Sequence, residues 1–207
     1  MDDETDPAPA SAAEALSIIH AQRRVAQQTT PSSALLFLVW GTAWLVGYGV
    51  LWLSAADDGT PTAAAAVLAA ALGVAAVVTT IVHINRRTRG ITGDSARQGT
   101  LYGWAWPIGF LAMSWIVGAL GRAGASDEVT GLAANSISAL VVGLLYLAGG
   151  VLWRATGMYV LGAWMALVGA ASAFAGMPGS YLWLSLAGGG GGLAVGMVEL
   201  ARRRAAS

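Results

Sequence analysis

The chain has 207 residues, of which 56% are hydrophobic and only 11% charged, and its mean hydropathy is +0.63. Such a composition is typical of membrane proteins and leaves little room for a soluble domain. The formal net charge is zero, which gives no overall attraction to nucleic acid, and the lack of cysteine excludes a disulfide framework, a thiolate nucleophile and a cysteine-ligated metal. The first partner that we expect is the lipid bilayer.

The N-terminal part is polar. Residues 1–10 are acidic and contain two prolines, so we expect this segment to be disordered. Ser11 then opens a capping-box pattern, and apolar residues recur roughly on one face, which predicts an amphipathic helix within 11–32. This helix can pack against the bundle in the cytoplasm or lie in the membrane surface, because Arg23 and Arg24 flank its apolar face. A docking site for a cytoplasmic partner is the third alternative.

Six apolar stretches follow, each long enough to cross a hydrocarbon core of about 30 Å at about 1.5 Å per residue. Short connections between them place consecutive helices antiparallel. We predict an all-α polytopic bundle over 33–201, arranged as three antiparallel helical hairpins (1–2, 3–4 and 5–6), with a basic tail at 202–207. The stretches run roughly over 34–54, 62–84, 101–121, 132–153, 158–176 and 180–200.

Arginine marks one side of the predicted bundle. All but one of the 11 basic residues fall before the first stretch, in the second and fourth connections, or after the last stretch. Short arginine-rich loops stay in the cytoplasm, so we expect both termini to be cytoplasmic. Lysine is absent and alanine and glycine are abundant, which is typical of high-GC genomes and indicates a bacterial plasma membrane. The arginines on this side are Arg23, Arg24, Arg86, Arg87, Arg89, Arg97, Arg154, Arg202, Arg203 and Arg204; the exception is Arg122.

The predicted spans contain almost no ionisable or reactive side chains. No Asp, Glu or Arg falls near the middle of a span, where ion-coupled carriers and proton pumps usually keep such a group. We expect Glu199 to form an ion pair with the terminal arginines, and His83 to serve as a polar cap at the headgroup level. No nucleophile–base pair, phosphate loop or metal-ligand pattern occurs. The sequence therefore predicts neither an enzyme nor a cofactor or metal site.

Glycines 188–192 form an unbroken run inside the last stretch. Gly188, Gly192 and Gly196 also stand four residues apart, which places them in one stripe on a helix. A stripe without side chains lets a neighbouring backbone approach closely, within the bundle or between protomers of a homo-oligomer. The alternative is a hinge that lines a ligand cavity, because each glycine lowers helix propensity by about 1 kcal/mol.

Nine tryptophans are many for this length. Trp40 and Trp44 lie one helical turn apart, so their rings can share one face of the first span. With Trp106 and Trp164 they are the candidates to line a pocket for a flat or apolar ligand. The alternative is that these rings pack against the glycine stripes.

Polar side chains also occur inside the spans. Asn135, Ser136 and Ser138 stand on the fourth stretch, and Thr79 and Thr80 stand on the second. In a membrane such groups form hydrogen bonds between helices. These five residues can therefore join neighbouring spans.

The frame Gly-x-Ala-Trp-x-(Val/Ile)-Gly-aromatic occurs at 41–48 and again at 103–110. It is either an internal repeat or a coincidence, because these residue types are common in the chain. With its preceding tryptophan the first copy reads Trp-Gly-x-Ala-Trp. Through this frame, the arginine-rich loop at 86–97 and the glycine run, the chain resembles uncharacterised six-span membrane proteins common in actinobacteria. That resemblance implies a fold and no activity.

The architecture is also similar to the permease subunits of ABC-2-type exporters. These begin with a cytoplasmic amphipathic helix, keep both termini inside and meet an ATPase subunit through their first cytoplasmic loop. Residues 85–100 would occupy that place here. The chain departs from this family between the fifth and sixth stretches, where only residues 177–180 stand in place of a re-entrant segment.

Two functions follow as expectations. The first is a non-enzymatic membrane subunit, permease-like in transport, that works through a cytoplasmic partner such as an ATPase subunit or a regulator. Its partner-facing residues would be Arg86, Arg87 and Arg89. The second is a self-contained sensor or carrier for a small apolar ligand lined by the tryptophans.

Overall fold

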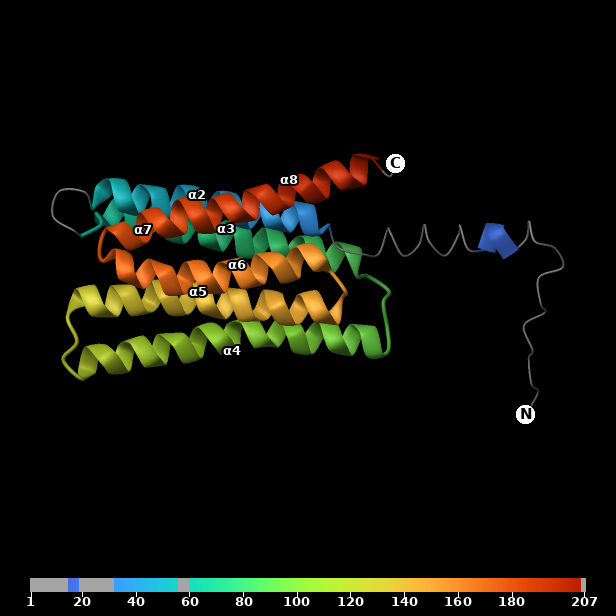
Figure 1. Cartoon of the computed structure of the whole chain (residues 1–207). Helices are drawn as coiled ribbons and strands as arrows, with labels where there is room; N and C mark the ends of the chain where they lie inside the picture. The colour runs from blue at the N-terminus through green and yellow to red at the C-terminus, as the bar shows by residue number, and fades with distance from the viewer. Residues whose placement is uncertain (1–14, 19–31, 56–59, 206–207) are drawn as a thin grey trace.

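The computed structural model describes residues 15–18, 32–55 and 60–205, and it is an all-α bundle without a strand in these ranges (Figure 1). Residues 15–18 are helical. The predicted disordered segment 1–10 and most of the predicted helix 11–32 lie outside the described residues. The elements are α2 (Ser33–Ser54), α3 (Ala63–Arg87), α4 (Asp94–Arg122), α5 (Asp127–Leu152), α6 (Thr156–Ser172), the 3-10 turn η1 (Ala173–Ala175), α7 (Gly179–Trp183), the π-helix η2 (Leu184–Gly189) and α8 (Gly190–Ala205).

Six helical segments in the described ranges are long and apolar enough to cross a membrane, which confirms the prediction of six spans. They are α2, α3, α4, α5, α6 with η1, and the continuous segment formed by α7, η2 and α8. Their length and composition make the chain a multi-pass membrane protein.

Serine and threonine caps explain where three of these helices begin. The hydroxyl oxygens of Ser32, Thr62 and Ser126 each accept a hydrogen bond from the backbone N–H three residues later, at 3.3–3.4 Å. Such caps satisfy backbone donors that the first turn of a helix leaves open. They fix the starts of α2, α3 and α5.

The start of α4 differs from the prediction. The third apolar stretch begins at residue 101, but α4 begins at Asp94, after Gly93 with a φ of 76°. A carboxylate in the first turn favours this extension, because it compensates the positive end of the helix dipole. The polar segment expected at 85–100 is therefore a short connection at 88–93 between the end of α3 and the polar first turns of α4.

Glycines bring α5 and α6 into close contact. A Cβ on Gly162 would lie 2.5 Å from the backbone nitrogen of Leu147, and a Cβ on Gly143 would lie 2.6 Å from the backbone nitrogen of Ala166. Separations this short leave no room for a side chain at either glycine. The two backbones pack directly on each other, as small residues allow in membrane helices.

The first and last spans meet in the same way. A Cβ on Gly41 of α2 would lie 2.7 Å from the backbone nitrogen of Leu193 on α8. In the second copy of the sequence frame, a Cβ on Gly103 of α4 would meet nothing within 4 Å. The two copies of the frame thus carry glycines with different surroundings.

The third hairpin contacts both of the others. The predicted pairs α2–α3, α4–α5 and α6–α7/η2/α8 are in contact, but the most extensive packing joins α6 to α5 and α8 to α2. Figure 1 shows α4 at one edge, followed by α5 and α6, with α2, α3 and α8 on the far side. No residue of α4 is buried within the chain.

The hydrophobic core lies where α2, α5 and α6 converge. Its buried residues are Phe37, Val142, Tyr146, Leu161 and Met165. Because α3 and α4 are largely exposed, their apolar side chains are left for the lipid.

Candidate functional site

Trp44 and Trp106 pack against the same core from different helices. The ring of Trp106 meets that of Tyr146 edge to face, with centroids 5.7 Å apart. The ring of Trp44 lies 5.2 Å from that of Tyr48. A Cβ on Gly188 would lie 3.0 Å from Cε3 of Trp44. Both tryptophans are partly buried against protein atoms.

Trp40 and Trp164 lie at two other helix interfaces. The indole N–H of Trp40 donates to the hydroxyl oxygen of Thr80, at 3.0 Å between α2 and α3. The indole N–H of Trp164 donates to the carbonyl oxygen of Ala187, at 2.8 Å between α6 and η2. The structure therefore places Trp44 and Trp106 against one core and Trp40 and Trp164 at two other helix contacts, and it does not gather all four around one cavity.

The glycine run lies in a continuous helical segment that has no break at the glycines. Its first two glycines end the π-helix Leu184–Gly189, and its last three begin α8, which continues directly from Gly190. In the predicted stripe, Gly188 faces Trp44, Gly192 faces Gly41 and Gly196 faces Leu38, so all three glycines lie against α2.

The π-helix is also bonded to its neighbours by side chains. The hydroxyl of Ser185 donates to the carbonyl oxygen of Leu45 on α2, at 2.7 Å. Trp164 of α6 donates to η2 on another side, as described above. These two bonds hold the π-helix against α2 and α6. The sequence showed the glycines of this span but gave no sign of the π-helix.

Four of the five polar residues predicted to join spans do so. Asn135 donates to the hydroxyl of Ser180 at 3.2 Å, the hydroxyls of Ser136 and Ser172 lie 3.4 Å apart, and Ser138 donates to the sulfur of Met113 at 3.0 Å. The fourth is Thr80, which accepts from Trp40.

The prediction for Thr79 was wrong. Its hydroxyl donates at 2.7 Å to the carbonyl oxygen of Ala75, one turn back in α3. Threonine commonly forms this bond within its own helix, as Thr80 also does with the carbonyl oxygen of Ala76. Thr79 is exposed in the bundle, so no partner helix competes for the hydroxyl.

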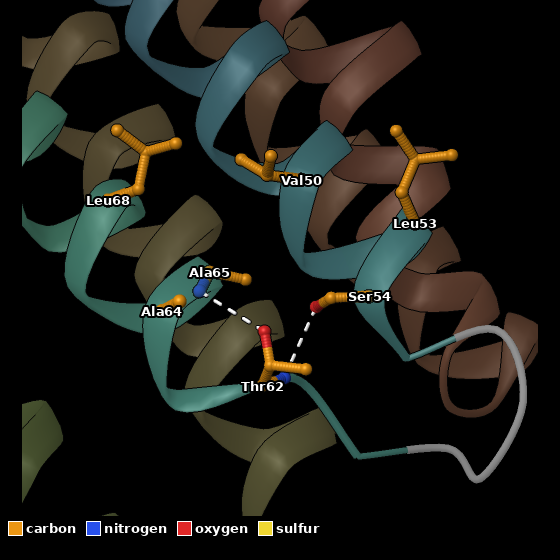
Figure 2. Close-up of a pocket in the computed structure, with 7 residues that line it drawn as sticks. All are labelled: Val50, Leu53, Ser54, Thr62, Ala64, Ala65 and Leu68. Atoms are coloured by element: carbon orange, nitrogen blue, oxygen red, sulfur yellow. Dashed lines mark hydrogen bonds between the residues drawn. The ribbon is translucent and has the colours of Figure 1, made fainter.

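A shallow pocket of about 390 Å³ lies between α2 and α3 at the end away from the chain termini (Figure 2). Two hydroxyl residues, Ser54 and Thr62, stand next to the connection between the helices, and apolar side chains line the rest. The backbone N–H of Thr62 donates to the hydroxyl of Ser54 at 3.3 Å. None of the four candidate tryptophans lines this pocket. The lining residues are Val50, Leu53, Ser54, Thr62, Ala64, Ala65 and Leu68.

The opposite end of the bundle carries the arginines. Among the described arginines only Arg122 lies at the pocket end; the others stand where α3 ends, α4 begins, α5 joins α6, and α8 ends. Arg86 and Arg89 are exposed on either side of the α3 C-terminus. The predicted ion pair is present, since Glu199 lies 3.7 Å from Arg202. Among the described residues, this end therefore has far more positive than negative side chains.

The same end contains a contact that sequence reasoning missed. The backbone N–H of Ser32, the cap of α2, donates to Nε2 of His83 at 2.9 Å. A guanidinium N–H of Arg203 donates to the hydroxyl of Ser33 at 3.5 Å. The histidine was expected only as a polar cap at the headgroup level, but it bonds the start of one span to the end of the next.

The described residues contain no group of three or more His, Asp or Glu side chains that could hold a metal ion. No protein-family model, curated protein or solved structure gives a significant match to this chain.

Proposed function

We propose that the chain is a non-catalytic membrane subunit that binds a cytoplasmic protein at its arginine-rich end, as permease subunits of transport systems bind an ATPase or a regulator. One observation carries this proposal. In the described residues every buried side-chain nitrogen and oxygen has a hydrogen-bond partner within the protein. The interior groups thus join helices to one another, and the arginine-rich end remains as the chemically distinct surface.

The connection between α3 and α4 is the part of this end that best suits a protein partner. Arg86 and Arg89 are exposed there. The glycines Gly90 and Gly93, with φ values of 88° and 76°, fix the reversal of the chain. A short, defined connection holds its charges in place, which favours a partner with an acidic surface.

The proposal also requires that this end face the cytoplasm. The positive-inside rule supports that orientation, because the excess of arginine lies in short connections and next to span ends. Both chain termini would then be cytoplasmic, in a bacterial plasma membrane.

The test is purification of the tagged protein in mild detergent after crosslinking, with mass spectrometry of what accompanies it. We expect one stoichiometric cytoplasmic protein with the natural chain, and its loss when Arg86→Gln and Arg89→Gln are combined. The matched control combines Arg97→Gln and Arg154→Gln, which removes the same charge from the same end but leaves the connection intact. The absence of any stoichiometric partner, or equal recovery with both double variants, contradicts the proposal.

A second candidate is a sensor or carrier for a small apolar ligand, and the pocket in Figure 2 is the observation that favours it. Its hydroxyl residues at one end and apolar lining suit an amphiphile with a single polar group. The probe is a dansyl-labelled fatty acid. Ala64→Phe, which fills the pocket, should abolish binding, whereas Ala70→Phe on an exposed part of the same helix should not. Equal binding by the two variants would exclude this pocket as the site.

A further inference from the structure

Gly190 is the one glycine of the run that its described neighbours do not explain. A Cβ built on Gly188, Gly189, Gly191 or Gly192 would lie within 3.1 Å of an atom of α2 or α6, so these four glycines allow close contact. A Cβ on Gly190 would have no described atom within 4 Å. Glycine lowers helix propensity there by about 1 kcal/mol relative to alanine, and the present packing does not require it.

The glycine run begins inside the π-helix. Backbone hydrogen bonds in η2 span five residues and not four, so its turn holds about one residue more than a turn of α-helix. The residues after η2 are therefore set back by one place along the helix. One place corresponds to about 100° around the helix axis and about 1.5 Å along it.

A π turn is a local insertion, so its position in a helix can change while the rest of the helix stays in place. If the π turn lay about one turn closer to the C-terminus, only the residues between its old and new positions would turn, which are Ala187–Gly190. Each of these four residues would take the place that the next residue holds now. The ends of the span, marked by Ser180 and Gly196, would keep their neighbours.

The glycines of the run suit this second register as well as the present one. Gly188 would move to the place of Gly189, against the backbone of Leu45, where a side chain has no room. Gly190 would move to the place of Gly191, where a Cβ would lie 2.6 Å from Nε1 of Trp164. The second register therefore needs a glycine at position 190, whereas the present register does not.

Two tryptophans would respond to the change of register. Ala187 would bring its methyl group to the place of Gly188, where a Cβ lies 3.0 Å from Cε3 of Trp44, so this ring must move. The hydrogen bond that Trp164 donates to the Ala187 carbonyl would break, because the carbonyl turns with its residue. Trp44 of α2 and Trp164 of α6 would thus respond together although they belong to different spans.

We propose that η2 is a mobile π turn, which exchanges between its present register and one about one turn further along, inside the glycine run. The exchange alters how α2 and α6 pack against the middle of the last span while both ends of that span stay in place. π turns are rare and often occur at functional sites, which suits such a role. The proposal depends neither on the cytoplasmic partner nor on the pocket between α2 and α3.

Two neighbouring glycines give opposite tests in the full-length protein in detergent. Gly190→Ala fits the present register, where its place is open, but in the second register its methyl group meets Trp164. Gly189→Ala fits the second register, in which it takes the open place, but in the present register it collides with the backbone of Leu45. Gly73→Ala on α3 is the control, because a Cβ there also has no described atom within 4 Å.

The measurement is fluorine NMR of protein labelled with 5-fluorotryptophan, with each signal assigned by replacing one tryptophan with phenylalanine. We expect Trp44 and Trp164 to exchange within microseconds to milliseconds with a minor state of about 1–10%, and the exposed Trp104 to show no such exchange. Gly190→Ala should lower the minor population about tenfold at both tryptophans, and Gly73→Ala should leave it unchanged. Gly189→Ala should turn the minor signals into the major ones.

Three results would overturn the proposal. The first is the absence of a shared exchange at Trp44 and Trp164 in the natural chain. The second is an equal effect of Gly190→Ala and Gly73→Ala on that exchange. The third is a folded Gly189→Ala protein whose major signals stay at the natural positions; if this variant does not fold, the comparison of Gly190→Ala with Gly73→Ala decides.

Discussion

Single glycines determine how closely the spans approach. Gly41 and Gly103 begin the two copies of the same sequence frame, yet one touches the backbone of α8 and the other is open. The difference lies in what faces each residue and not in the local sequence. Sequence reasoning could therefore recognise the repeated frame but could not tell in which copy the first glycine touches another helix.

We expect Gly41→Ala to destabilise the protein by about 1–3 kcal/mol, because its methyl group would collide with the α8 backbone. Gly103→Ala should be neutral or stabilise by up to about 1 kcal/mol, since alanine favours the helix and meets no neighbour. Unfolding of both variants in detergent measures the difference. Equal effects would show that α2 and α8 are not packed as described.

Among the elements, the last span departs most from a regular helix. The apolar pattern predicted its length and its contact stripe of glycines, whereas the π-helix depends on partners from α2 and α6 that lie far away in the sequence. The polar start of α4 was also missed, because apolar content marks the membrane-spanning part of a helix and says little about its extension into water. The serine and threonine caps that begin α2, α3 and α5 are local signals of a helix start, but the apolar pattern made no use of them.

Trp164→Phe should weaken the contact between α6 and the π-helix. The variant keeps an aromatic ring but loses the N–H that donates to the Ala187 carbonyl, so we expect a loss of about 1 kcal/mol in unfolding free energy. Trp104→Phe on the exposed face of α4 is the control and should change stability little. If the two variants unfold alike, the hydrogen bond does not stabilise the span.

At the scale of the whole molecule, the number of spans and their antiparallel hairpins could be predicted, because apolar length and short connections determine both. The arrangement of the hairpins could not be predicted, because it depends on which glycine-containing helix faces pack against each other. The candidate tryptophans illustrate the same limit. Their positions on the spans were visible in the sequence, but their partners Thr80, Tyr146 and Ala187 come from other helices.

The sidedness of the bundle can be measured directly, because the chain contains no cysteine. A cysteine introduced as Thr92→Cys, in the connection between α3 and α4, should react with an impermeant reagent only after the cells are opened. Ala123→Cys, at the opposite end of α4, should react in intact cells. The reverse pattern would place the arginine-rich end outside and contradict the proposed cytoplasmic partner.

The contacts of the third hairpin with both other hairpins have a consequence for biosynthesis. In the described part of the chain, the first and second hairpins meet through core side chains such as the rings of Phe37 and Tyr146, whereas the extensive packing of α2 is on α8 and that of α5 is on α6, two spans that begin after Ala155. When only α2 to α5 have been inserted into the membrane, the two hairpins therefore lack most of the contacts that later join them. Assembly must wait for the C-terminal quarter of the chain, so a premature stop there would leave unpaired hairpins for membrane proteases to remove.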